Sequence, residues 1–193
     1  SKLGGNATAS VSAAVLQAGA ASLGIPLYQH IGGVNACIMP VPGVITVVGS
    51  TRYGGGARSG GKPSYSLMCY GFESFSDAAY AGWEASNEFG HLMQAKHGIA
   101  HGQGQGVLVT PGYVSHDREL WDVMVEAIAN TGYEGRIGIQ VDVAAGTYWE
   151  PSKGRFVGLF SPEDKTREEM IALYKTMVAE YPFVIIEDPL DED

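Results

Sequence analysis

Two acidic residues stand at the ends of apolar runs, where they could bind a metal ion. Asp142 follows "IGIQV", and Glu187 follows "FVII". Both runs are typical of buried strands in a parallel sheet, and the carboxyl ends of such strands carry the chemistry in α/β folds. Carboxylates are hard oxygen ligands that suit Mg²⁺. The sequence predicts a Mg²⁺ site at Asp142 and Glu187; the alternative is that both are ordinary loop acids or helix caps.

A glycine-rich segment could bind an anion. "GSTRYGGGARSGGK", at 49–62, offers backbone N–H groups together with Arg52, Arg58 and Lys62. Such a loop could fold over an anionic substrate and exclude water, and we predict that Arg52 and Arg58 contact the substrate. The alternative is a flexible connection that needs glycine for its turns. The segment is not a P-loop, because no GK[ST] closes it.

Two further patterns give weaker signals. "HGQGQG", at 101–106, lacks the spacing of a dinucleotide-binding loop and does not directly follow a predicted strand. His97 and His101 stand four residues apart, but Gly98 and Gly102 interrupt any helix that would align them. We therefore expect neither a nucleotide site nor a zinc site there.

Hydrophobic periodicity predicts alternating helices and strands. The sequence pattern predicts helices at 6–23, 75–93 and 117–130, and a fourth helix that opens at "SPED" from Ser161. Strands are predicted at 38–48, 65–71, 137–143 and 183–189, with a long mobile loop at 49–62. After the first helix the order is β, β, α, α, β, α, β, which is typical of an α/β fold. The continuous apolar runs of the final strands are typical of a parallel sheet.

Composition excludes several classes of partner. Among 193 residues, 45% are hydrophobic and 17% charged, as in ordinary globular proteins. The formal net charge of −9 argues against binding nucleic acid or an anionic membrane through a basic surface. No apolar stretch reaches the ~20 residues of a membrane span, and we expect neither a membrane span nor a signal peptide. With only Cys37 and Cys69 present, we expect a reducing, cytoplasmic environment.

Several segments in the correct order resemble the enolase (phosphopyruvate hydratase) family. They are "SKLGGNATASVSAAVLQAGAASLGIPLYQHIGG", "MPVPGVITVVGS", "GIQVDVAAGTYW" and "YPFVIIEDPLDED". Together these segments reach from one end of the chain to the other. The resemblance implies a partial enolase-type TIM barrel, with residues 1–35 as a helical segment that leads into the barrel and residues 36–193 as its first half.

The resemblance also implies an activity. The family dehydrates 2-phosphoglycerate to phosphoenolpyruvate with Mg²⁺, and Asp142 and Glu187 correspond to two of the three carboxylates that hold the metal. A lysine removes a proton from the substrate, and glutamates assist departure of the hydroxyl. By resemblance we expect a small anionic carboxylate substrate and a homo-oligomer.

Some family positions are replaced. Where the family has a histidine-bearing GGSHAG, this chain has "VGSTRYG". Ser64 falls near the place of one catalytic glutamate, and Gln103 or Gln105 near the place of another. Serine and glutamine cannot act as carboxylic acids. We therefore expect either a lyase for an altered phosphorylated or phosphonylated carboxylic acid, or a catalytically inactive paralogue or fragment with a binding or assembly role.

The length leads to a further expectation. A barrel of this type needs about 250 residues. We expect the chain to be a fragment, or one chain of a split protein. The N-terminal capping domain, the C-terminal half of the barrel, the third metal ligand and the catalytic lysine are then expected outside it.

Overall fold

The computed structural model describes residues 3–56 and 61–191. The chain divides into two compact units, Ser1–Pro40 and Val41–Asp193. The predicted boundary was after residue 35. Arg58, which was predicted to contact the substrate, lies outside the described residues.

The first unit is helical. It contains α1 (Gly5–Leu23), α2 (Leu27–Gly32) and the 3₁₀ helix η1 (Gly33–Asn35), so the predicted first helix is confirmed. Gly24 ends α1 in the left-handed conformation. His30 of α2 packs against Gly19 of α1, where an added Cβ would lie 2.8 Å from His30 Nε2.

The length and composition of these helices bear on whether one of them could span a membrane. Within the described residues no single helix meets both criteria. Gly5–Leu23 and Leu27–Asn35 meet them only together, as a pair bent by 96° at the break.

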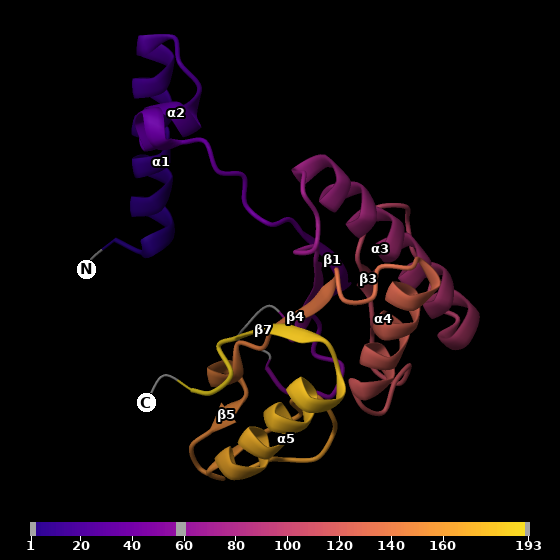
Figure 1. The fold of residues 1–193 in the computed structure, drawn as a ribbon. Helices are drawn as coiled ribbons and strands as arrows, with labels where there is room; N and C mark the ends of the chain where they lie inside the picture. Colours follow the sequence, from indigo (N-terminus) through magenta and orange to yellow (C-terminus); the bar gives the residue numbers. More distant parts are fainter. Residues whose placement is uncertain (1–2, 57–60, 192–193) are drawn as a thin grey trace. The chain divides into compact units, whose positions relative to one another are not determined.

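The second unit is built on a five-stranded sheet in the order β3-β1-β2-β4-β7 (Figure 1). Its strands are β1 (Gly43–Val48), β2 (Ser64–Met68), β3 (Val107–Leu108), β4 (Gly138–Asp142) and β7 (Phe183–Glu187). β1 pairs parallel with β3, and β4 pairs parallel with β7. The described strands form an open sheet.

The final strands, β4 and β7, are parallel as expected, whereas β2 runs antiparallel to both β1 and β4. The described part of the connection between β1 and β2 contains no helix, and a parallel return normally requires such a crossover. β1 also begins later than predicted, because Pro40 and Pro42 cannot donate hydrogen bonds to a sheet.

One row of paired residues, which crosses the sheet, shows the register of the strands. Val47 pairs with Val107 on one side and with Tyr65 on the other, and Tyr65 pairs with Val141, which pairs with Ile186. We call the edge at which β1, β3, β4 and β7 end the carboxyl edge. The next residues toward this edge are Leu108, Val48, Ser64, Asp142 and Glu187.

Three helices accompany the sheet: α3 (Phe75–His97), α4 (Arg118–Asn130) and α5 (Arg167–Glu180). α3 and α4 confirm the predicted second and third helices, and Figure 1 shows them side by side. The core includes sheet residues such as Leu67 and Val141 together with helix residues such as Trp121. On the opposite face of the sheet the described residues leave Ile185 40% exposed.

The predicted start of the last helix at Ser161 is wrong. α5 begins at Arg167, where Thr166 and Glu169 form a capping box. Lys165 is already committed to a β-bridge with Phe156, and its Nζ donates to the buried Ser161 side chain. Residues 161–165 therefore form a turn that precedes the helix. Met170, Tyr174 and Met177 of α5 are buried, whereas Val178 is exposed.

Several short elements were not predicted. β3, β5 (Trp149–Glu150) and β6 (Arg155–Phe156) have two residues each, and η3 (Ala145–Thr147) has three. A segment of two or three residues shows no periodicity that a sequence pattern could detect. The predicted order of the longer elements is retained.

Candidate functional site

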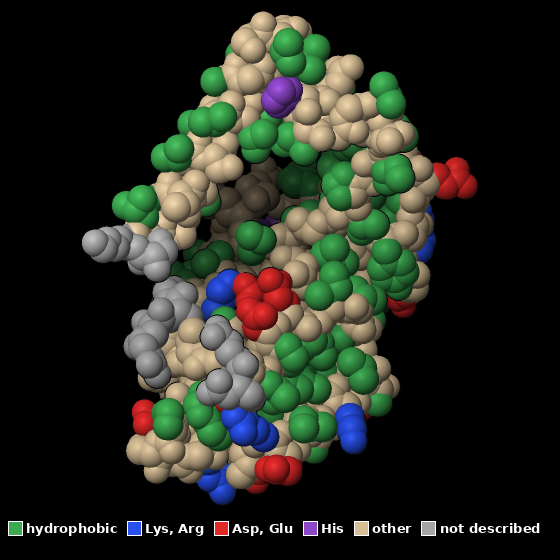
Figure 2. Space-filling view, turned by 90° about the vertical axis from the view of Figure 1, so that its left-hand side faces the viewer, with side chains coloured by type: hydrophobic (Ala, Val, Ile, Leu, Met, Phe, Trp, Pro, Cys, Tyr) green, Lys and Arg blue, Asp and Glu red, His purple; other side chains and the backbone are tan. Residues whose placement is uncertain are grey.

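Asp142 and Glu187 lie side by side at the carboxyl edge. They are Cα partners at the last residues of β4 and β7, so their side chains leave the same face of the sheet. Gln140 Nε2 donates to Glu187 Oε2 at 3.3 Å. Asp142 is half-buried and Glu187 is exposed. Figure 2 shows a group of acidic side chains beside a basic one on one face of the molecule.

Lys62 is the cation next to Asp142. Its Nζ donates to Asp142 Oδ2 and, at 3.4 Å, to Ser64 Oγ. The side chains of Lys62 and Asp142 are 28% and 26% exposed, so water reaches the ion pair. The sequence showed Lys62 only as one of three cations in a glycine-rich segment, and nothing in its spacing indicated Asp142 as its partner.

Tyr148 fixes the backbone of Lys62. Its hydroxyl donates to Lys62 O and accepts from Lys62 N at 3.2 Å. Its ring is buried against Gly56, where an added Cβ would lie 2.2 Å from ring carbon Cζ. The glycine is thus needed for a close approach, and this described part of the 49–62 segment is packed against Tyr148.

A second ion pair, between Arg52 and Asp117, lies inside the protein. Arg52 Nε donates to Asp117 Oδ1 at 2.7 Å and Nη2 donates to Oδ2 at 2.5 Å. Tyr53 and Tyr65 donate their hydroxyls to the same carboxylate at 2.8 and 2.6 Å. Pro63 O accepts from Arg52 Nη1 and Nη2 at 3.2 Å. This buried cluster ties the segment after β1 to the start of α4.

Burial and charge shift the pKa values in this cluster. Burial alone would lower the pKa of Arg52, but the Asp117 carboxylate raises it. Burial, together with the Asp117 charge, raises the pKa of Tyr53 and of Tyr65. The guanidinium is therefore charged and both phenols are neutral at physiological pH. The sequence did not indicate Asp117, because its partners come from β2 and from the segment after β1.

The structure brings only some of the predicted site residues together. Ser64 is the Cα partner of Asp142 and lies beside the acidic pair. Gln105 does not, because it precedes Val107 by two residues and therefore lies toward the other edge of the sheet. Arg52 is 4% exposed and is held by protein groups, so contact of Arg52 with a substrate stays a prediction.

The described residues contain no group of three or more His, Cys, Asp or Glu side chains placed to hold a metal ion. The candidate site in these residues thus consists of two carboxylates, from Asp142 and Glu187, with Lys62 and Ser64 beside them. Two carboxylates can suffice for Mg²⁺, which commonly keeps several water or substrate oxygens.

The described strands and helices, with acids at the carboxyl edge of a mixed sheet, place the chain in the α/β class. Residues 36–193 match the family model described as "Enolase, C-terminal TIM barrel domain". The chain is 38% identical over 200 residues to a protein named "Enolase" from Methanopyrus kandleri, covering 100% of this chain and 44% of that protein.

Two further relatives agree. An "Enolase" from Bifidobacterium longum is 35% identical over 197 residues, and one from Methanococcus aeolicus is 33% identical over 194 residues. All of this chain and 43% or 44% of these relatives are aligned. The chain therefore belongs to the enolase family. It has an α/β fold that corresponds to part of the family's barrel domain, and it spans less than half the length of these curated relatives.

Proposed function

We propose that the protein to which this chain belongs is an enolase-type, Mg²⁺-dependent lyase. Its substrate would be 2-phosphoglycerate or a related phosphorylated or phosphonylated carboxylic acid. The observation that carries the proposal is the pairing of Asp142 with Glu187 at the carboxyl edge of a sheet that belongs to the enolase family. Family membership supports the reaction class, and the two acids support the metal.

Asp142 and Glu187 have the chemistry that Mg²⁺ requires. Both offer carboxylate oxygens from adjacent strands, and Gln140 orients Glu187 by donating to Oε2. When bound there, Mg²⁺ would supply positive charge against the negative charge that develops on a substrate carboxylate. Lys62 would have to leave Asp142 Oδ2 for that oxygen to serve as a metal ligand.

The segment between β1 and β2 would position groups around the substrate. Its described part is held by Asp117 and by Tyr148, and it carries Lys62 to the acidic pair. Substrate contact by Arg52 and Arg58, assembly into a homo-oligomer and a cytoplasmic location remain predictions. So does the role of Ser64 and Gln105 as replacements of family glutamates.

Metal binding is the sharpest test of this proposal. Isothermal titration with Mg²⁺ and Mn²⁺ should show a site that is weakened at least about tenfold, or ~1.4 kcal/mol, by Asp142→Asn and by Glu187→Gln. Asp164→Asn is a matched control, because Asp164 is a carboxylate in a surface ion pair with Lys153. Cation binding that none of the three variants changes would rule out this acidic pair as the metal site.

Turnover is tested separately, on the full natural protein. Release of phosphoenolpyruvate from 2-phosphoglycerate, followed by its ultraviolet absorbance, should depend on Mg²⁺ and on Asp142. Metal binding without turnover of 2-phosphoglycerate would point to an altered substrate.

A second candidate function is a catalytically inactive enolase paralogue that has a binding or assembly role. The observation in its favour is that an ammonium group already neutralises Asp142, while Ser64 beside it has no acidic proton to give. This candidate predicts no cation binding in the wild-type protein and none after Lys62→Met. Cation binding that depends on Asp142 would exclude it.

A further inference from the structure

A pocket of about 440 Å³ lies in the second unit, away from the acidic pair. Its volume is within the range of small-molecule sites. Gly71, which lines it, follows the end of β2, and Arg136, also in its lining, precedes the start of β4. Met68 and Gly138 are Cα partners at those strand ends, whereas Ser64 and Asp142 are partners at the other ends. The pocket is therefore at the sheet edge opposite the candidate metal site.

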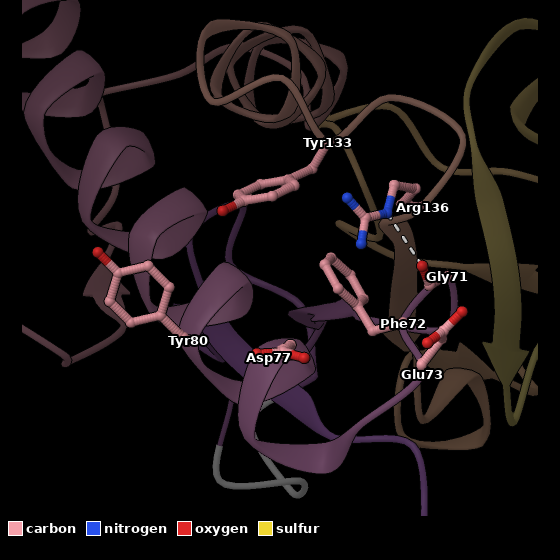
Figure 3. A pocket seen from close by; sticks show the side chains of 7 residues that line it. All are labelled: Gly71, Phe72, Glu73, Asp77, Tyr80, Tyr133 and Arg136. Carbon is pink, nitrogen blue, oxygen red and sulfur yellow. Dashed lines mark hydrogen bonds between the residues drawn. The ribbon is translucent and has the colours of Figure 1, made fainter.

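Arg136 is held in place through Nε and through its stacking on Phe72, which leaves its two terminal nitrogens for a ligand. Its Nε donates to Gly71 O at 2.9 Å, and its guanidinium carbon lies 4.0 Å from the centroid of the Phe72 ring. Within the described residues Nη1 and Nη2 have no hydrogen-bond or ion-pair partner. Figure 3 shows both nitrogens directed away from Gly71, toward the space between Tyr133 and Phe72. Two parallel donors on a fixed plane match the two oxygens of a carboxylate.

Gly71 and Arg136 are locked to each other by their backbones as well. Gly71 N donates to Arg136 O at 2.9 Å. A Cβ on Gly71 would lie 2.6 Å from Arg136 Cα, so only glycine allows this approach. Stacking on Phe72 and these backbone contacts reduce the freedom that Arg136 would lose on binding a ligand.

The opposite charge comes from Glu73 and Asp77. Both are exposed and line the same pocket. Asp77 accepts from Ser74 Oγ at 2.7 Å, and the described residues provide no partner for Glu73. A ligand with only negative charge would face these two carboxylates, and a ligand with only positive charge would face Arg136. A ligand that carries both charges can pair with Arg136 and with a carboxylate of the same lining.

Aromatic rings form the rest of the wall. Phe72 and Tyr133 meet edge to face with centroids 5.6 Å apart, and Tyr80 lines the pocket from α3. The Tyr133 hydroxyl donates to Glu84 Oε2 at 2.6 Å, which fixes that ring. Such rings favour contact with a flat apolar group.

We propose that this pocket binds a free α-amino acid with an aromatic side chain. Arg136 receives the carboxylate, Glu73 and Asp77 receive the ammonium group, and Phe72, Tyr80 and Tyr133 contact the side chain. This site is independent of the proposed lyase function and uses none of the residues at the carboxyl edge.

The test compares L-phenylalanine with two analogues that each lack one charge, 3-phenylpropionate and phenethylamine, by isothermal titration. L-Phenylalanine should bind at least about tenfold more tightly than either analogue. Arg136→Met keeps an apolar stem over Phe72 and should weaken L-phenylalanine binding at least about tenfold. Glu73→Gln together with Asp77→Asn should weaken it to a similar extent.

Two matched controls should leave L-phenylalanine binding unchanged. Arg118→Met removes another arginine, partly exposed, that lies over an aromatic ring, Trp121, and Asp142→Asn removes the proposed metal ligand. Asp142→Asn also separates this proposal from the lyase proposal, since it should weaken only cation binding. The proposal is overturned if L-phenylalanine does not bind, if either analogue binds equally well, or if the Glu73 and Arg136 variants bind like the wild type.

Discussion

Two ion pairs hold the connection between β1 and β2, and they differ in how far water reaches them. The side chains of Arg52 and Asp117 are 1% and 0% exposed, and tyrosine hydroxyls occupy the remaining capacity of the carboxylate. The side chains of Lys62 and Asp142 are 28% and 26% exposed. The buried pair is fully committed to the fold, whereas the partly exposed pair can exchange its partner for a ligand. One pair positions the segment and the other is available for chemistry.

The largest loss of stability is expected when the buried ion pair, Arg52 with Asp117, is disrupted. Asp117→Asn should lower the free energy of unfolding by about 3–5 kcal/mol, because it leaves the Arg52 charge buried without a counter-charge. Asp142→Asn, at the partly exposed pair, should change the free energy of unfolding by less than ~1 kcal/mol. Urea unfolding followed by tryptophan fluorescence measures both. Equal losses of unfolding free energy in the two variants would show that the two ion pairs contribute equally to stability.

Alkaline pH should weaken the protein through the buried cluster. The pKa values of Tyr53 and Tyr65 are raised in the folded state, so their neutral forms stabilise the fold. That stability is fully present below the unfolded value of about 10 and is lost as the pH rises above it. The free energy of unfolding should therefore fall with rising pH above ~10.

Tyr65→Phe provides the internal control for this pH dependence. Near pH 8 the variant should be less stable than the wild type, because it lacks one hydrogen bond to Asp117. Above pH 10 the difference should shrink, since the variant has one buried phenol fewer to ionise. A constant difference across this range would contradict the role given to Tyr65.

An intermediate effect is expected where Tyr148 holds Lys62. Tyr148→Phe removes the hydroxyl shared by Lys62 N and Lys62 O and should cost about 1–2 kcal/mol of unfolding free energy. Tyr113→Phe is the matched control, because Tyr113 is 48% exposed, and it should cost less than ~0.5 kcal/mol. Similar losses of unfolding free energy in the two variants would argue that the Tyr148 hydroxyl does not hold the backbone of Lys62.

The smallest effect on stability is expected at Lys62 itself. Lys62→Met should change the free energy of unfolding by less than ~1 kcal/mol. It should raise the affinity of Asp142 and Glu187 for Mn²⁺ by about tenfold, because the competing ammonium is gone. Lys153→Met, in a surface pair with Asp164, should change neither quantity. An affinity that falls in Lys62→Met would show that Lys62 supports the metal site.

Much of the fold was predictable because its signals are local. The periodicity of α3 and α4 and the apolar runs of β4 and β7 each lie within one segment, and the acids that end those runs do too. The resemblance in "VDVAAG" and "IIEDP" added the identity of the proposed metal ligands, Asp142 and Glu187.

The sequence by itself determined the order of the longer elements and the two acids at strand ends. The tertiary structure decided which groups lie next to those acids. Lys62 lies 80 positions from Asp142, and Arg52 lies 65 from Asp117, so no spacing rule connects them. The antiparallel direction of β2 brings Ser64 to Asp142, whereas the parallel pairing of β3 with β1 leaves Gln105 toward the other edge. Pairing across the sheet depends on packing of the whole unit, and this is the physical reason that sequence patterns could not supply it.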